Sequence, residues 1–171
     1  MDYEDLSYWV TSEFNLSLIL SNLSLLFLAF LFALPMALNR ERSARSAGLR
    51  TFPLVSIASC GYMLIGLTAF EAEGAIARVA YGIITGMGFI GGGAILKSKG
   101  NIKGTATAAS IWNTGAIGVS VAFRMYEIAL VLSLVNWAIL HFAKPDKEKK
   151  ISKEILNNIQ EVDLESIEQI D

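Results

Sequence analysis

Residues 16–38 read LSLILSNLSLLFLAFLFALPMAL, without one charged side chain. A helix crosses a bilayer core of about 30 Å with roughly 17 to 25 apolar residues, so this stretch is long enough to span it. Of all 171 residues, 53% are hydrophobic and 18% are charged, and the mean hydropathy is +0.48. An ordinary soluble domain has about 25% charged residues. The composition therefore excludes a soluble domain, a disordered chain and a coiled coil, and predicts a membrane protein.

Four more apolar stretches follow the first. Together they predict an all-α polytopic membrane protein whose membrane domain, 16–143, has five spans at about 16–38, 52–70, 75–96, 105–123 and 128–143. The third and fourth spans are rich in Gly, Ala, Ser and Thr, which lowers their hydropathy but favours close helix packing. The fifth is short, and flanking Arg124 and Lys144 can reach the two interfaces with their long side chains.

The charged loops predict the orientation of the spans. Twelve Lys and Arg residues follow the first, third and fifth spans, whereas two, Arg78 and Arg124, fall on the other side. Basic residues accumulate in cytoplasmic loops. We therefore expect the N-terminus outside, with 1–15 as an acidic extracytoplasmic tail, and the C-terminus in the cytoplasm. The residues before the first span are acidic, so that span is expected to be retained rather than cleaved as a signal peptide.

The segment 144–171 differs sharply in composition from the spans. Ile151, Ile155 and Ile159 recur at helical spacing among Lys and Glu. This pattern favours a cytoplasmic tail that is disordered or forms an amphipathic helix on the bilayer surface. A helix that binds a partner protein is the alternative.

Few residues are available for chemistry. The chain has one cysteine, Cys60, and one histidine, His141, which argues against a disulfide, a Cys- or His-rich metal site and a Ser-His-Asp triad. The central spans contain no carboxylate, which an embedded Mg²⁺ site or a proton relay would usually need. We expect no catalysis, no cofactor, no resident metal and, with a net charge of −2, no nucleic-acid binding. An enzyme acting on lipid through Cys60 or His141 is the weakest alternative.

The third span carries an unusual run of glycines. Gly86, Gly88 and Gly91 match the G-x-G-x-x-G pattern, but no acidic residue follows at the distance that a dinucleotide site requires, and the pattern lies inside a span. Close helix packing through Gly82-x-x-x-Gly86 and Gly88-x-x-x-Gly92 is the favoured interpretation. The triplet Gly91-Gly92-Gly93 either packs against another helix or breaks its own, which would free backbone carbonyls for an ion.

Two further groups of polar residues are candidates for a site. Asn113, beside Trp112 and Thr107 in the fourth span, favours a hydrogen bond between helices over a ligand contact. At the cytoplasmic side, Glu41 ends the first span and Arg50 precedes the second, so the two could form an ion pair across the hairpin. The arginines either anchor the loop by their charge or bind an anionic headgroup or an acidic residue of a partner.

Three blocks of sequence resemble the MgtC/SapB family. They are Arg40-Glu41 with Ala47-Gly48-Leu49-Arg50-Thr51, the run from Gly86 to Ile95, and Gly104 with Thr107–Trp112 and Gly115–Gly118. The resemblance implies a five-helix protein of the bacterial inner membrane, linked to adaptation to low Mg²⁺ and, in pathogens, to survival inside host cells. It also implies action through other membrane proteins. Asn39 stands where the family usually has Glu, and the 28 residues after Ala143 are too few for the folded cytoplasmic domain that many members carry.

The expected function is therefore a regulatory or adaptive one in magnesium supply, exerted through membrane partners. The alternative is an ion or small-solute transporter or channel, and either protein could be a homo-oligomer in the lipid bilayer. The residues expected to form the functional surface are Arg40, Glu41, Gly48, Arg50, Thr51, Gly86, Gly88, Gly91, Gly92, Gly93, Gly104, Thr107, Trp112 and Asn113.

Overall fold

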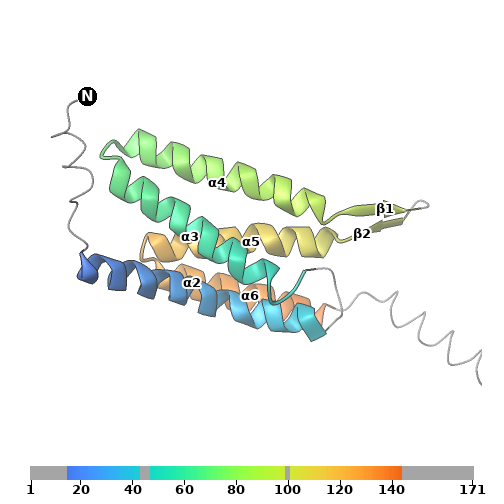
Figure 1. Cartoon of the computed structure of the whole chain (residues 1–171). Coiled ribbons are helices and arrows are strands. Elements are labelled where there is room, and N and C mark those ends of the chain that lie inside the picture. Colours follow the sequence, from blue (N-terminus) through green and yellow to red (C-terminus); the bar gives the residue numbers. More distant parts are fainter. Residues whose placement is uncertain (1–14, 43–46, 99–100, 144–171) are drawn as a thin grey trace, which may run out of the picture. The chain divides into compact units, whose positions relative to one another are not determined.

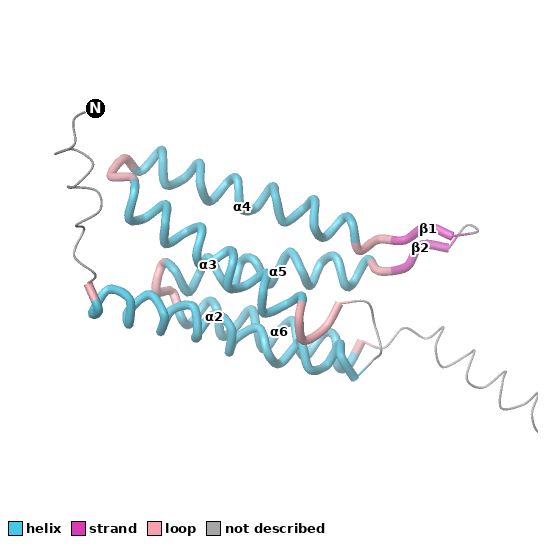
Figure 2. The backbone as a smooth tube through the Cα atoms, viewed as in Figure 1, coloured by secondary structure: helices cyan, strands magenta, loops and turns pink. Residues whose placement is uncertain are grey.

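The computed structural model describes residues 15–42, 47–98 and 101–143. This part of the chain forms five helices and one hairpin (Figures 1 and 2), in the order α2 (Leu16–Arg42), α3 (Thr51–Ala69), α4 (Glu73–Gly93), β1 (Leu96–Ser98), β2 (Asn101–Lys103), α5 (Thr105–Ala122) and α6 (Tyr126–Phe142). The chain divides into two compact units, Met1–Trp137 and Ala138–Asp171. The packing below is that of the first unit.

The helices confirm the expected mainly helical fold with apolar segments, although the described chain also forms a short β-hairpin. Three of them are long and apolar enough to cross a bilayer, at Leu16–Glu41, Thr51–Ala69 and Glu73–Gly93, and α6 is a shorter apolar helix. The fourth expected span coincides with α5, whose small and hydroxyl-bearing residues lower its hydropathy. The first helix continues to Arg42, four residues beyond the expected end of its span.

Helix α3 lies at the centre of the bundle, because it packs most extensively against α5 and then against α2. Ser56 shows how close these contacts are. Its hydroxyl donates a hydrogen bond of 2.8 Å to the Ala29 carbonyl of α2. Its own carbonyl faces Gly118 of α5, where a Cβ atom would overlap it. Small residues therefore let three helix backbones approach one another, as is common in membrane bundles.

Helix α4 has few buried residues. It packs against α5 and less against α3, and only Met87 and Gly91 are buried along it. At Gly91 an added Cβ would lie 3.0 Å from the Ala108 carbonyl oxygen of α5. The side of α4 that carries Gly88 and Gly92 has open space around it, since a Cβ at either would meet nothing within 4 Å.

The segment after α4 corrects one expectation. The third span was expected to reach residue 96, but α4 ends at Gly93, and Leu96–Ser98 pairs antiparallel with Asn101–Lys103. The Ala94 N–H donates to the Gly91 carbonyl and the Ile95 N–H to the Gly92 carbonyl, each at 3.0 Å, so the glycine triplet closes the helix rather than continuing it. Gly104 then joins the hairpin to α5 with a φ of 90°. The small hairpin projects past the ends of α4 and α5 (Figure 1).

Candidate functional site

The turn between α2 and α3 is held by Glu41. Its carboxylate accepts the Leu49 N–H at 3.1 Å, and it lies so close to Gly48 that a Cβ there would overlap it. The Gly48 carbonyl in turn accepts the Phe52 N–H at 3.3 Å in the first turn of α3, which begins at Thr51. The expected ion pair between Glu41 and Arg50 is not formed among the described residues. Glu41 instead fixes the backbone that positions Arg50.

The two arginines of this region have opposite environments. Arg40, one of the residues expected on the functional surface, is only 4% exposed. Arg50, at the start of α3, is exposed. Of the two, Arg50 is therefore the one that can meet a headgroup or a partner.

A buried polar cluster, missed by the sequence analysis, joins α2, α5 and α6. The Asn136 carboxamide accepts the Ser110 hydroxyl at 3.2 Å and approaches the Met36 sulfur at 2.9 Å through its nitrogen. The Thr114 hydroxyl donates to the Ser110 carbonyl at 2.7 Å and lies 3.2 Å from the same sulfur. The cluster satisfies its own polar groups inside an apolar bundle. A lone Asn in an otherwise apolar helix, at position 136, was the signal that could have revealed it.

Asn113 makes the contact expected between helices. Its side-chain nitrogen donates to the Leu132 carbonyl of α6 at 3.4 Å. Trp112, next to it, is 52% exposed and turns outward, whereas Thr107 is buried. These three expected site residues therefore do not converge on one cavity. Asn113 joins α5 to α6.

The glycine run separates into two groups. Gly91 packs on α5, but a Cβ at Gly86, Gly88, Gly92 or Gly93 would meet nothing within 4 Å. The expectation that Gly82-x-x-x-Gly86 and Gly88-x-x-x-Gly92 pack against neighbouring helices is therefore wrong for the described chain. The glycines that do make close contacts include Gly115, which lies against Met87, and Gly118, which lies against the Ser56 backbone. Neither was among the expected site residues. The side of α4 that carries Gly88 and Gly92 is left uncovered.

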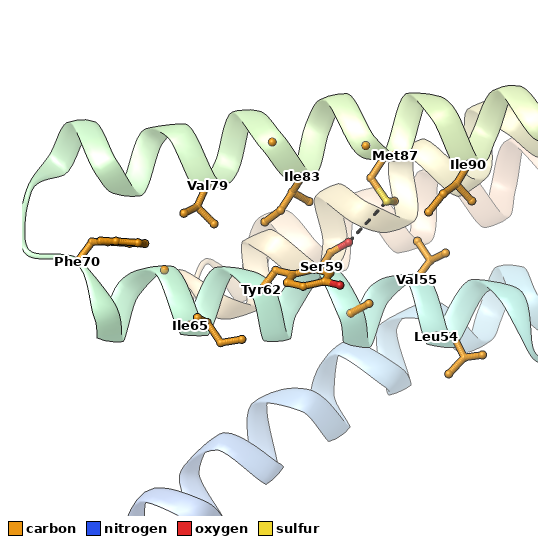
Figure 3. A pocket seen from close by; sticks show the side chains of 14 residues that line it. Leu54, Val55, Ser59, Tyr62, Ile65, Phe70, Val79, Ile83, Met87 and Ile90 are labelled. Carbon is orange, nitrogen blue, oxygen red and sulfur yellow. Dashed lines mark hydrogen bonds between the residues drawn. The ribbon is translucent and has the colours of Figure 1, made fainter. Parts of the chain in front are cut away.

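A groove of about 680 Å³ separates α3 from α4. Figure 3 shows Val79 and Ile83 on α4 directed toward α3, from which Tyr62 and Ile65 also contribute to the lining. Ser59 donates to the Met87 sulfur at 3.7 Å across the middle. No charged side chain lines it. In the described residues, no three His, Cys, Asp or Glu side chains gather as a metal site would require.

Comparisons with known proteins identify relatives of this chain. The family model described as the MgtC family matches residues 26–149. Protein SrpB of Synechococcus elongatus is 34% identical over 62% of this chain and 65% of its own length. YhiD of Escherichia coli K12 is 32% identical over 77% of this chain and 60% of its own. Protein MgtC of Salmonella typhimurium is 32% identical over 57% of this chain and 41% of its own. The chain thus spans less than two thirds of each of these relatives. No solved structure matches it.

Proposed function

The chain belongs to the MgtC family, and on that premise we propose that it is a non-catalytic inner-membrane factor that adapts the cell to low magnesium by contacting other membrane proteins. In this proposal all five helices cross the bilayer, the N-terminus lies outside and the C-terminus lies in the cytoplasm. The loop between α2 and α3 and the hairpin, with the basic residues Arg50 and Lys103, are then cytoplasmic.

The single observation that carries this proposal is the uneven coverage of the bundle. The polar groups between α2, α5 and α6 bond to one another, so the interior is a packed core in which Asn136 and Thr114 are already satisfied. Helix α4, in contrast, leaves Gly88 and Gly92 with nothing within 4 Å. Glycines at the surface of a membrane helix allow the backbone of another helix to approach closely. The side of α4 that carries Gly88 and Gly92 is thus the proposed contact surface.

Arg50 is the proposed second element of the site. It is exposed where α3 begins, and the bond from Leu49 to Glu41 fixes the turn just before it. Guanidinium groups bind carboxylates and phosphates in a bidentate manner. Arg50 can therefore act at the cytoplasmic membrane surface while α4 makes contacts within the bilayer.

The test is growth of a strain that lacks the gene, at limiting and at replete Mg²⁺, after complementation. We expect wild type to restore growth at limiting Mg²⁺. Arg50→Ala and Gly88→Leu should fail to do so while reaching the membrane in normal amounts, because each alters an exposed contact and no internal packing. Growth at replete Mg²⁺ should not distinguish the variants.

Lys103→Ala is the matched control, because it removes one positive charge from the same side of the membrane at an exposed position. It should complement like wild type. If Lys103→Ala failed as Arg50→Ala does, the arginine would only anchor the loop by its charge. If both Arg50→Ala and Gly88→Leu complemented fully, the proposed contact site would be refuted.

The second candidate function is transport of an ion or small solute. It is favoured by one comparison, since the name of the relative YhiD refers to magnesium transport. In that case Asn113 and the end of α4 at Gly91–Gly93 would line a path formed between copies of the chain. Flux through reconstituted protein separates the two functions.

A further inference from the structure

We propose that the groove between α3 and α4 binds one acyl tail of an anionic phospholipid, whose phosphate is held at the Arg50 end. This lipid-binding proposal depends on the proposed function in one respect, the assignment of Arg50 to the cytoplasmic leaflet. It gives Arg50 a ligand that the proposed contact with membrane proteins does not specify.

The walls of the groove suit a hydrocarbon chain. Its floor is formed by buried residues, among them Val55, Ser59 and Met87, and its rim by exposed apolar side chains such as Tyr62 and Ile90. In Figure 3 these side chains extend from both helices toward the space between them. Only Ser59 and Tyr62 carry polar side-chain atoms there, and the Ser59 hydroxyl is bonded to Met87. The lining thus offers contacts to an apolar ligand.

Glycine keeps the groove open on the α4 side. Gly82 and Gly86 both line it, and a Cβ at either would meet nothing within 4 Å. On the opposite wall, Gly66 of α3 lies against Val79, and an added Cβ would be 3.0 Å from a methyl group of that residue. A larger side chain at Gly86 would therefore fill the groove without meeting the protein backbone. This separates a role in ligand binding from a role in folding.

The charges at the two ends give the groove a direction. Arg50 lies one turn before Leu54, the first groove residue of α3, and the Leu54 N–H bonds to the Arg50 carbonyl at 3.4 Å. At the other end, Phe70 is followed by Glu71 and Glu73. A phosphate is attracted by the arginine and repelled by the two carboxylates. The headgroup is thus placed at the Arg50 end and the tail toward Phe70.

The length of the groove agrees with this orientation. At about 1.5 Å per residue, the helical path from Leu54 to Phe70 is about 24 Å long. One leaflet contributes about 15 Å, half of a hydrocarbon core of about 30 Å. A tail that enters at the Arg50 end can therefore remain in the groove over the full depth of its leaflet.

The test begins with the full chain reconstituted in nanodiscs with equal amounts of phosphatidylglycerol and phosphatidylcholine. The protein is then extracted in a mild detergent, and native mass spectrometry identifies the lipid that stays bound. Wild type should retain more phosphatidylglycerol than phosphatidylcholine. Gly86→Phe should lower lipid retention by about tenfold, the effect of losing contacts to a few methylenes. Gly88→Phe is the matched control on the uncovered side of the same helix and should retain lipid like wild type. Arg50→Gln should retain lipid but lose the preference for phosphatidylglycerol.

Three results would overturn the proposal. They are equal lipid retention by Gly86→Phe and wild type, the absence of a preference between the two lipids in wild type, and a wild-type dimer that Gly86→Phe dissociates. The last would show that a second copy of the chain occupies the groove. Lipid retention is measured on purified protein, so its failure would be distinguishable from a failure of the growth experiment.

Discussion

Gly118→Val should abolish accumulation of the folded protein in the membrane. A Cβ at residue 118 would overlap the Ser56 carbonyl oxygen and lie 3.0 Å from the Cys60 nitrogen, both of which are backbone atoms of α3. Neither can move without shifting the whole helix. The α3–α5 contact is the most extensive one in the bundle, and Ser56 is also bonded to α2. We expect a loss of more than about 4 kcal/mol, a large part of the stability of a typical domain.

The measurement is the amount of monodisperse protein after detergent extraction, together with its thermal unfolding midpoint. Gly88→Val is the control, since it introduces the same β-branched residue into a helix at a position with open space around it. It should accumulate like wild type. Equal accumulation of Gly118→Val and Gly88→Val would contradict the close packing of α3 on α5.

Gly104→Ala should destabilise the protein by about 2–4 kcal/mol. Gly104 has a φ of 90°, in the left-handed region that side chains disfavour. A Cβ there would also overlap the Ala94 carbonyl oxygen and lie 3.4 Å from the Ile95 Cα, so the residue is confined by the backbone at the end of α4. The Gly104 carbonyl accepts the Ala108 N–H at 2.8 Å and so forms the first turn of α5.

Thermal unfolding of the detergent-solubilised variant measures this effect. Gly93→Ala is the comparison, because Gly93 lies near the same hairpin with nothing within 4 Å of an added Cβ. That variant should unfold at the wild-type temperature or slightly above it, since alanine is the better helix former. An unchanged midpoint for Gly104→Ala would show that the turn before α5 does not require glycine.

The positions of the helices could be predicted because the bilayer constrains whole segments. The expected spans 52–70 and 105–123 agree with α3 and α5 to within one residue at each end. The end of α4 was missed because Ala94, Ile95 and Leu96 continue the apolar run beyond Gly93. The hairpin was missed because its strands pair through backbone groups, which composition does not reveal.

The candidate site was less predictable, because it depends on which side of each helix is covered. Glycines in the third span were expected to pack against other helices, but of the run from Gly86 to Gly93 only Gly91 does. Asn136 contacts Met36, and Gly118 packs against Ser56. Both partners lie more than fifty residues away in sequence. No local pattern identifies such partners. The type of contact that Asn113 makes, a hydrogen bond between helices, could be predicted because a polar group inside a span needs a hydrogen-bond partner.

Magnesium flux into proteoliposomes tests most directly the claim that the chain acts by contact and not by conduction. The purified full chain would be reconstituted with a trapped magnesium indicator, beside empty liposomes and liposomes treated with an ionophore. The proposed function predicts that influx through the reconstituted protein equals that of empty liposomes, even though wild type restores growth at limiting Mg²⁺. Saturable influx that depends on the protein and is lost in Asn113→Leu would contradict it and establish transport.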